Sequence, residues 1–437
     1  MDSIVKNKKV LIITYYWPPS GGAGVQRWLK FSKFLPELGW DPVIFTPENP
    51  DVPVEDYSLI EEVHPTIEVL KIPIFEPSRV IKFFGGKTST NRIGASTSSN
   101  GKTSLIKGII NWVRGNIFIP DARAAWVRPS VKYLNKWLDS HSVDAIITTG
   151  PPHSMHLIGL GVKNSHPSIK WISDFRDPWS DMDYLDEFKI GNRARKKLIS
   201  MESEVVKHSD KIIITSPSVA KSLLKNDNLE KATFIPNGWD SLDFKNVKAA
   251  STNPQVFKIG HFGSLSGSRN MPGFFKAVNR WNSVENLKIE LHLVGSVSDG
   301  IKQELNKQNH ITFTPSLPHK QAVNEMLSCH ALLLVQNATD AARKCIPGKV
   351  FEYIACDKPL LSICNSPSDL AAQLDNWGLP FCDHDDQDTA YQMLKSVIQS
   401  HKKDALTKVD PSLYERKTLT KKLVAEMNIL MQTSKLD

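Results

Sequence analysis

The chain has 437 residues, of which 41% are hydrophobic and 23% charged, and its formal net charge at pH 7 is +8. This length predicts two domains of a soluble protein, and the basic excess suits anionic partners such as phosphates, lipid headgroups or nucleic acid. No run reaches the roughly 18 apolar residues of a membrane span, and the start lacks a signal-peptide layout. The five cysteines contain no CxxC pair, which argues against a disulfide framework and a zinc site. We therefore expect a protein of the reducing cytoplasm.

Short apolar runs recur along the chain, and each is followed by a turn signal and a helical stretch. In the first half the runs are residues 9–16, 41–47, 143–152, 169–175, 210–218 and 232–238. In the second half they are residues 257–264, 287–296, 310–316, 331–337 and 359–366. Wholly apolar strands that alternate with helices are typical of parallel sheets covered on both faces. The fold class that we predict is therefore α/β, with two doubly wound, Rossmann-like domains.

The two series of strands meet near residues 240–255, and this sets the domain boundary. We expect an N-terminal domain over residues 1–245 and a C-terminal domain over residues 246–408. Residues 409–437 have helical periodicity and no strand after them. We expect a final helix there, and a return of that helix to the first domain is one open arrangement.

The stretch from residue 77 to residue 120 stands apart, because it has seven basic residues and no acidic one. Its middle is a low-complexity polar tract, so we expect a mobile basic insert over about residues 78–118 of the first domain. Residues 102–118 place aliphatic side chains at helical spacing, with Lys107 and Arg114 on the opposite face. Such a basic amphipathic helix fits contact with an anionic membrane surface, but packing on the first domain would produce the same pattern.

A glycine-rich stretch, "YYWPPSGGAGVQRW" at residues 15–28, follows the first predicted strand and opens a helix near Val25. Glycine permits positive φ and lets a ligand approach the backbone, and helix N-termini bind anions. The spacings GxGxxG and GxxxxGK[ST] are both absent, which argues against a nicotinamide enzyme or a P-loop ATPase. Gly21, Gly22 and Gly24 are therefore candidate ligand-contacting residues, with a plain linking turn as the alternative.

Two strand-to-helix turns of the second domain form a matching set. The first, "GSLSGSRN", follows the run 257–264, and the second, "PGKVFEY", opens a helix. A free helix N-terminus beside a lysine can hold a diphosphate, and a glutamate one turn later can accept hydrogen bonds from two ribose hydroxyls. An ordinary helix start with an i,i+3 charge pair is the alternative. The candidate donor-binding residues are Gly263, Ser264, Arg269, Gly348, Lys349 and Glu352.

These segments resemble the glycosyltransferases of family 4, which have the GT-B architecture of two Rossmann-like domains facing each other across a cleft. The resemblance spans nearly the whole chain and is carried by "YYWPPSGGAGVQR", "IPNGWDSLDF", "FGSLSGSRN" and "PGKVFEYIACDKPLL". It implies transfer of a sugar from a nucleotide-sugar donor bound in the interdomain cleft, usually with retention of configuration and without an essential metal. The co-substrate that it implies is a UDP- or GDP-sugar, with no cofactor.

Two positions depart from the family pattern. Ser264 stands where the family has its first phosphate-contacting arginine, with Arg269 in the place of the following lysine. Lys344 replaces the first glutamate of the family's E-x7-E pair, while Glu352 holds the second. The sequence therefore predicts nucleotide binding but leaves the donor sugar open.

Two clusters at strand ends supply candidate catalytic groups on the acceptor side. His153 follows the run 143–152, and Asp174, Arg176 and Asp177 lie at the end of the next run. Many family members have a catalytic histidine near the position of Arg176, but an arginine cannot act as a base. The role of a base, where one is needed, would fall to His153, Asp174 or Asp177. In a retaining reaction the protein mostly positions the groups and stabilises the departing diphosphate, so a strong base is not required. The resemblance makes the glycine loop the acceptor side of the cleft, and we group Arg176 with Gly21, Gly22 and Gly24 there.

The function that we predict is a metal-independent, hexosyltransferase-type retaining glycosyltransferase. Its acceptor would be a glycan or a lipid-linked molecule in the synthesis of surface polysaccharide, lipopolysaccharide or glycolipid. We expect the protein in the cytoplasm, and a peripheral position at the inner face of the cell membrane stays open. The DxD match at Asp181 and Asp183 is short enough to arise by chance, so we predict no metal there. A GT-B epimerase or phosphorylase and a non-catalytic membrane-surface binding protein are the alternatives. Nucleic acid is not expected, since basic residues are spread over both domains without a base-stacking motif.

Overall fold

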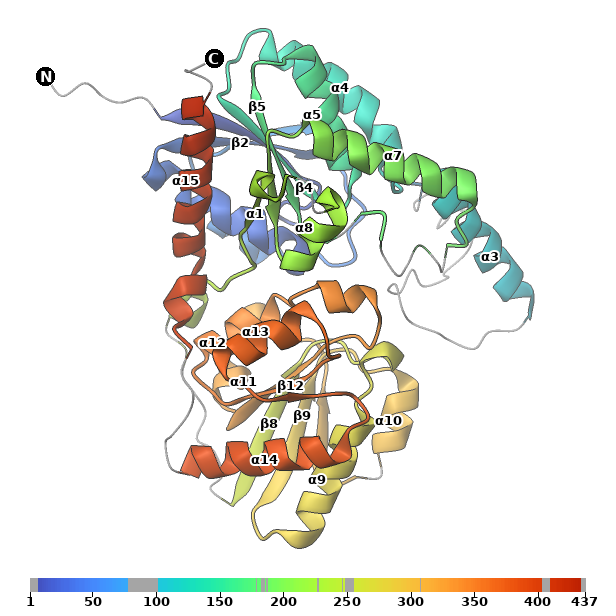
Figure 1. Ribbon diagram of the computed structural model, residues 1–437, viewed down its shortest axis with the longest axis vertical. Coiled ribbons are helices and arrows are strands. Elements are labelled where there is room, and N and C mark those ends of the chain that lie inside the picture. The colour runs from blue at the N-terminus through green and yellow to red at the C-terminus, as the bar shows by residue number, and fades with distance from the viewer. Residues whose placement is uncertain are drawn as a thin grey trace, which may run out of the picture. The chain divides into compact units, whose positions relative to one another are not determined.

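The computed structural model describes residues 7–77, 101–177, 179–181, 185, 188–225, 228–245, 247, 255–306, 308–402 and 409–433. These residues fall into two compact units (Figure 1). The first unit holds the described residues up to Pro236 and from Arg416 onward, and the second runs from Asn237 to Glu415. The division thus falls inside the "IPNG" segment, ahead of the boundary at residues 245 and 246 that the strand pattern predicts.

The first unit is built on a seven-stranded sheet in the order β3-β2-β1-β4-β5-β6-β7, with every neighbouring pair parallel. Its strands are β1 Lys8–Ile13, β2 Trp40–Pro47, β3 Glu68–Ile72, β4 Ala145–Gly150, β5 Lys170–Phe175, β6 Lys211–Ile214 and β7 Ala232–Phe234. Its helices are α1 Ala23–Phe34, α3 Gly101–Asn116, α4 Ala124–Leu138, α5 Ser154–Ser165, α7 Asn192–His208, α8 Pro217–Leu224 and α15 Arg416–Thr433. Short 3₁₀ helices lie at Pro36–Leu38, Tyr57–Glu62 and Leu229–Lys231.

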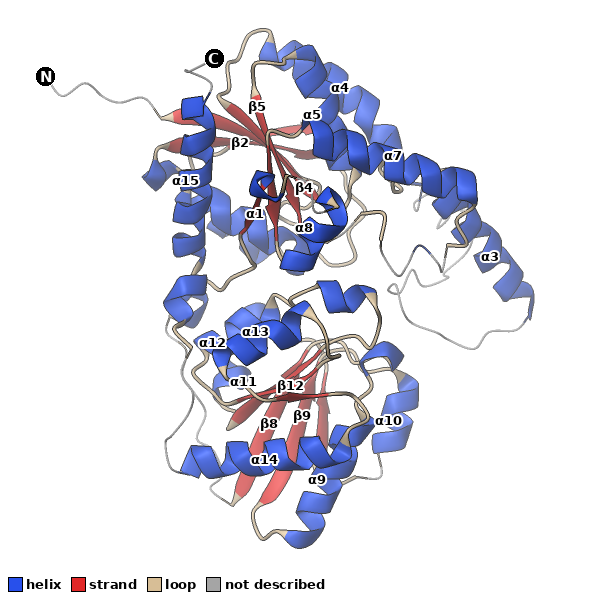
Figure 2. Cartoon of the chain, in the orientation of Figure 1, coloured by secondary structure: helices blue, strands red, loops and turns tan. Residues whose placement is uncertain are grey.

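Both faces of this sheet are covered by helices, as Figure 2 shows. Side chains alternate across a strand, so Leu11 and Ile13 of β1 join the core under α4, α5, α7 and α8. Val10 and Ile12 join the opposite core, under α1 and α15. Burial on both faces explains why the inner strands read as continuous apolar runs in the sequence, whereas the edge strand β3 is exposed or half-buried along its length and does not.

The second unit repeats this plan with a six-stranded parallel sheet in the order β10-β9-β8-β11-β12-β13. Its strands are β8 Val256–Phe262, β9 Lys288–Val294, β10 Ile311–Thr314, β11 Ala331–Val335, β12 Leu360–Ile363 and β13 Phe381–Cys382. Its helices are α9 Pro272–Val284, α10 Asp299–Leu305, α11 His319–Leu327, α12 Lys349–Ala355, α13 Asp369–Trp377 and α14 Gln387–Lys402. Short 3₁₀ helices lie at Ser241–Phe244, Gly267–Arg269, Ala341–Lys344 and Pro411–Tyr414.

The strand order reverses direction once in each sheet. In the first unit the reversal lies between β1 and β4, and in the second between β8 and β11. Ligands of open α/β sheets bind outside the carboxyl ends of the strands at such a switch point. The loops that follow these four strands are therefore where each unit would hold a ligand.

Helix α15 packs in the first unit, beside α1. Near its ends Lys417 pairs with Glu37 at 2.7 Å, and Asn428 accepts a hydrogen bond from Lys8 at 3.0 Å. Its buried residues, among them Leu423, belong to the core that also contains the apolar side of α1. The last helix of the chain is thus a structural part of the first unit.

The predicted amphipathic helix corresponds to α3, but side chains at 101–107 and 109, together with the polar tract at 78–100, lie outside the described residues. The end of α3 is held by Arg114, whose guanidinium lies 4.9 Å from the ring centre of Phe188. Trp112 is 49% exposed. Among the helices described here, none has the length and apolarity to cross a membrane.

Candidate functional site

In the second unit, the turns after β8 and β11 are joined by the side chain of Arg269. Its guanidinium donates to the carbonyl and the hydroxyl oxygen of Ser264, at 3.2 and 2.9 Å, and to Oδ1 of Asn337 at 2.6 Å. Ser264 follows β8 and Asn337 follows β11. Arg269 therefore lies at the switch point of this sheet, where the sequence predicts donor-binding residues.

Lys349, the first residue of α12, lies against the same turn. Its ammonium donates to the carbonyl oxygen of Phe262, the last residue of β8. Burial lowers the pKa of Lys349, Glu352 opposes this shift, and Arg269 adds to it. Burial also lowers the pKa of Arg269. Neither cation forms an ion pair with the described residues, so the switch point has two partly desolvated positive charges that an anion would balance.

Two glycines let the backbone at this turn pack tightly. A Cβ on Gly295, which has φ +132°, would lie 2.2 Å from the carbonyl oxygen of Gly263, so only glycine fits there. Beside Gly263 lies His261, whose Nδ1 is 2.9 Å from the carbonyl oxygen of Leu333. Burial lowers the pKa of His261 to about 4, and the charges of Lys349 and Arg269 act in the same direction. His261 is therefore a neutral side chain in the wall of the site.

A cavity of about 370 Å³ lies at the carboxyl ends of β9 and β10. Its lining residues are Gly295, Ser296, Lys302, Phe313, Thr314, Pro315 and Ser316. Two of its lining residues adjoin the turn after β8, because Gly295 packs against Gly263 and Ser296 accepts a hydrogen bond from the N–H of Leu265 at 2.8 Å. Its volume lies in the range of small-molecule sites.

In the first unit, the glycine loop follows β1 and ends at α1. Gly22 has φ +83°, a conformation that L side chains rarely adopt, and the site of its missing Cβ is open. The N–H of Gly21 donates to the carbonyl oxygen of Val54 at 2.8 Å. A Cβ on Gly24 would lie 2.9 Å from the ring of Tyr16. The loop is thus fixed at both sides of Gly22, while Gly22 itself borders open space.

Arg176 connects this loop to the loop after β4. Its guanidinium donates to the carbonyl oxygens of Gly24 and Gly150, at 3.1 and 3.2 Å, and to that of Pro151. Burial lowers the pKa of Arg176, with Asp174 and Asp177 opposing the shift. The guanidinium, which cannot act as a base, holds two loops of the switch point together.

Asp174, proposed from the sequence as catalytic, lies on β5 and is fully buried. Its carboxylate accepts hydrogen bonds from Trp28 Nε1, Thr149 Oγ1 and the guanidinium of Arg27, which pairs with it at 2.8 Å. Both members of the pair are almost entirely excluded from solvent, with side-chain exposures of 1% and 0%. A carboxylate with all these donors cannot reach a substrate, so the structure argues for a structural role of Asp174. The strand-end position suggested catalysis, but it did not reveal the buried partner.

His153 precedes α5 and is 2% exposed. Its ring lies parallel to Trp179 at 5.0 Å, and neither ring nitrogen has a hydrogen-bond partner among the described residues. Burial lowers the pKa of His153 well below its ordinary value, and His156 and Arg176 add to this. His153 is therefore neutral and has an unused acceptor nitrogen. Asp177, one residue beyond Arg176, is half-buried.

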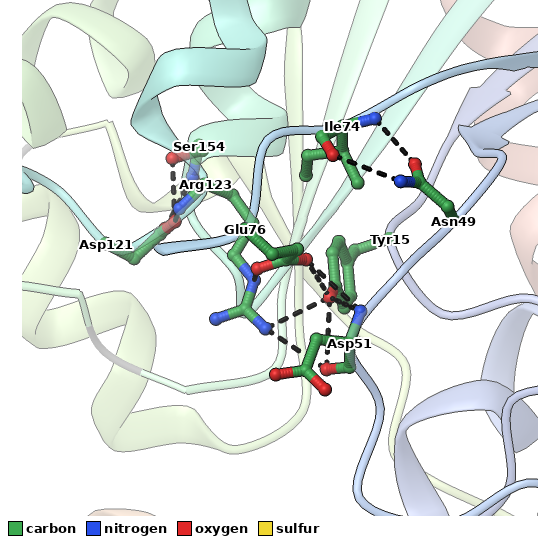
Figure 3. Close-up of polar contacts among 8 residues, drawn as sticks. All are labelled: Tyr15, Asn49, Asp51, Ile74, Glu76, Asp121, Arg123 and Ser154. Atoms are coloured by element: carbon green, nitrogen blue, oxygen red, sulfur yellow. Dashed lines mark hydrogen bonds and ion pairs between the residues drawn. The ribbon is translucent and has the colours of Figure 1, made fainter. Parts of the chain in front are cut away.

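A polar cluster that sequence reasoning missed joins the loops after β1, β2 and β3 (Figure 3). Tyr15 donates its hydroxyl proton to Glu76 and accepts hydrogen bonds from Arg123 at 3.0 Å and from the N–H of Asp51 at 3.1 Å. Burial raises the pKa of Tyr15, so its hydroxyl stays protonated. The sequence signal was weak, because the cluster joins residues that are far apart along the chain.

Neither a scan against family models nor a search of curated proteins gives a match. Among solved structures, sucrose-phosphate synthase from Thermosynechococcus elongatus aligns over 98% of this chain and 100% of its own, with TM-score 0.62 and 12% identity. Anabaena HepE, solved in complex with UDP and glucose, aligns over 97% and 100%, with TM-score 0.60 and 12% identity. A putative UDP-N-acetylglucosamine 2-epimerase from Listeria monocytogenes aligns over 96% and 96%, with TM-score 0.56 and 10% identity.

At these identities the likeness shows the fold alone. Together with the two parallel sheets, it confirms the prediction of two Rossmann-like domains of the GT-B architecture. The prediction of glycosyltransferase family 4 is not settled by it. Four loops lie at the switch points of their own units: the glycine loop after β1 and the loop after β4 in the first unit, and the turns after β8 and β11 in the second.

The buried pair of Arg27 and Asp174 generates a stability prediction. Asp174→Asn leaves the guanidinium of Arg27 without its counter-charge, and we expect a loss of about 3–5 kcal/mol in the free energy of unfolding. The matched control is Asp388→Asn, which breaks an exposed pair with Arg280 (90% and 49% exposed) and should cost less than about 1 kcal/mol. Urea unfolding followed by circular dichroism measures both. Wild-type stability in Asp174→Asn, with loss of activity alone, would return Asp174 to the catalytic candidates.

The buried histidines predict how stability depends on pH. Burial lowers the pKa of His156 to about 3, from an ordinary value of 6.5. Between these pH values His156 binds a proton in the unfolded chain and not in the folded chain. The contribution of His156 to the free energy of unfolding is therefore complete above pH 6.5 and is lost as the pH falls toward 3. One such group contributes a slope of up to about 1.4 kcal/mol per pH unit. We expect His156→Gln to reduce the slope of unfolding free energy between pH 6.5 and 4.5, whereas the exposed control His141→Gln should leave it unchanged.

Proposed function

We propose that this protein is a glycosyltransferase that moves a sugar from a nucleotide-diphosphate sugar to a glycan or lipid-linked acceptor. The observation that supports it most directly is the pair of partly desolvated cations, Lys349 and Arg269, at the switch point of the second sheet. A diphosphate is the anion whose size and charge suit two adjacent cations. The fold likeness to HepE, whose structure contains UDP and glucose, supports the same class.

In this proposal each donor-binding residue has a defined part. The diphosphate lies along Gly263, Ser264 and Gly348, with Lys349 and Arg269 on its oxygens. Glu352 accepts hydrogen bonds from the ribose, and the nucleobase enters the adjoining cavity. Because α12 has only seven residues, the two cations contribute more to anion binding than the dipole of the helix.

The same cations supply the catalytic electrostatics. When the bond between the sugar and the diphosphate breaks, negative charge grows on the leaving diphosphate, and fixed positive groups stabilise it more than the ground state. The proposed retaining course needs little help from a base under these conditions. His153, with its neutral imidazole, and Asp177 are the groups that we propose to face the acceptor hydroxyl, and Arg176 supports them by holding the two loops together.

The finer assignments are also proposals. We keep family 4 membership, a UDP- or GDP-sugar donor, hexosyl transfer without metal, and a role in the synthesis of surface polysaccharide, lipopolysaccharide or glycolipid. A cytoplasmic location with contact between α3 and an anionic membrane surface fits the exposed Trp112 and the basic sequence around it. Asp183 of the DxD match lies outside the described residues.

An epimerase with the same fold is the second candidate, because the Listeria structure shares this architecture. The two differ in what they release. A transferase releases free nucleoside diphosphate, slowly by hydrolysis of the donor and faster with an acceptor. An epimerase returns an isomeric nucleotide sugar that still contains the diphosphate. Incubation with UDP- and GDP-sugars followed by separation of the products distinguishes them, and release of nucleoside diphosphate supports the transferase.

Nucleotide binding is predicted to depend on Lys349 and Glu352. Lys349→Ala and Glu352→Ala each remove a charged hydrogen-bonding group, so each should weaken UDP or GDP binding by about 1.5–3 kcal/mol in titration calorimetry. The exposed residues Lys276 and Glu304 of the same unit provide control alanine variants of the same types. If both site variants bind nucleotide as tightly as the wild type, the donor site lies elsewhere.

Gly22 is predicted to affect turnover and not nucleotide binding. Gly22→Val places a β-branched residue at φ +83°, which forces the acceptor-side loop out of its conformation. We expect a loss of nucleotide release from the sugar donor of at least about tenfold, with UDP affinity near that of the wild type. Gly300→Ala, at a glycine with open space and no positive φ, is the control. Equal losses of turnover and affinity would make the loop a folding element only.

A further inference from the structure

Arg123 is held rigidly at the carboxyl edge of the first sheet. Its Nη2 donates to Tyr15 Oη at 3.0 Å, its Nε lies 3.6 Å from Glu76 Oε2, and its guanidinium carbon is 4.6 Å from the centre of the Tyr15 ring. Glu76 has no exposed side-chain surface, and Tyr15 is 1% exposed. Ion pairing and ring stacking therefore fix the plane of the guanidinium.

One end of this guanidinium has no partner within the described part of the chain. Among the described residues, no hydrogen bond or ion pair involves Nη1 of Arg123, and Figure 3 shows this nitrogen pointing away from Tyr15 and Glu76. The side chain is 16% exposed, so a ligand can reach it. A fixed, reachable guanidinium edge is a binding group for an oxyanion, since its N–H donors match carboxylate and phosphate oxygens.

The cluster is connected to the loop that contains His153. Asp121, two residues before Arg123, accepts hydrogen bonds from the N–H and the hydroxyl of Ser154, both at 2.8 Å. Ser154 is the first residue of α5 and follows His153 directly. The short segment from Asp121 to Arg123 thus contains Arg123 and also anchors the first residue of α5, next to His153.

We propose that Arg123 binds an oxyanion, a phosphate or a carboxylate, of the acceptor substrate. This inference rests on the proposed function, and it adds that the acceptor is anionic. Tyr15 and Glu76 are the positioning residues for Arg123. The sequence between Glu76 and Arg123 fits the same charge, because residues 77–120 include seven basic residues and no acidic one.

The test is titration calorimetry of the full chain saturated with UDP, which fills the proposed donor site. The probes are inorganic phosphate, glucuronate and neutral methyl glucoside. We expect phosphate or glucuronate to bind the wild type and the exposed control Arg128→Gln equally, and Arg123→Gln about ten- to hundredfold more weakly. Tyr15→Phe, which keeps the ring and removes the hydroxyl, should weaken the same anion several-fold. Equal binding of the anions to Arg123→Gln, or binding of methyl glucoside alone, would overturn the proposal.

A second measurement needs no variant and remains valid if Arg123→Gln fails to fold. Phenylglyoxal modifies accessible arginines, and mass spectrometry reports the rate at each one. Phosphate or glucuronate should slow modification of Arg123 and leave that of exposed Arg128 unchanged, and no protection of Arg123 would contradict the inference. Failure of UDP to bind would count against the donor site, whereas phosphate protection tests Arg123 alone.

Discussion

The buried pair of Arg27 and Asp174 is the interaction on which the first unit depends most. Arg27 belongs to α1, the helix that the glycine loop opens, and Asp174 belongs to β5. The same guanidinium donates to the carbonyl oxygens of Ile235 and Pro236, at 2.9 and 3.0 Å, where the chain leaves the unit. One side chain therefore fixes the loop proposed to face the acceptor, the central sheet and the exit of the chain. Its burial makes each partner indispensable to the other.

The second unit fixes its own ends beside the proposed donor site. Trp239 donates its backbone N–H to Tyr414 O at 3.1 Å and its indole N–H to Pro411 O at 2.7 Å, so the entering and leaving segments are paired. Tyr414 also packs on Phe351 of α12, with ring centres 4.9 Å apart. Within this unit, the paired ends therefore rest on the helix that begins with Lys349.

Periodicity was sufficient to predict most strands of both sheets, because burial on both faces makes an inner strand a continuous apolar run that the sequence displays directly. The edge strand Glu68–Ile72 was missed, because its residues are exposed or only half-buried and form no such run. It was not sufficient to assign chemistry to individual side chains. Asp174 has the strand-end position of a catalytic group, but its partner Arg27 lies 147 residues earlier in the chain. Glu76 and Arg123 have no local pattern, and only the tertiary fold brings them to Tyr15. The short strand Phe381–Cys382 was also missed, since two residues are too few to show a period.

The arginines and the lysine near the switch points have different partners in the two units. In the first unit Arg27 and Arg123 are neutralised by buried carboxylates, and Arg176 is bound by carbonyl oxygens. In the second unit the partners of Lys349 and Arg269 within the described part of the chain are all neutral oxygens, although burial lowers the pKa of both. Keeping a desolvated cation unpaired costs stability, and such a cost is expected where a ligand supplies the missing charge. This contrast favours the second unit for the nucleoside diphosphate proposed above, whereas the oxyanion proposed at Arg123 would use the outer edge of a guanidinium that is already paired with Glu76.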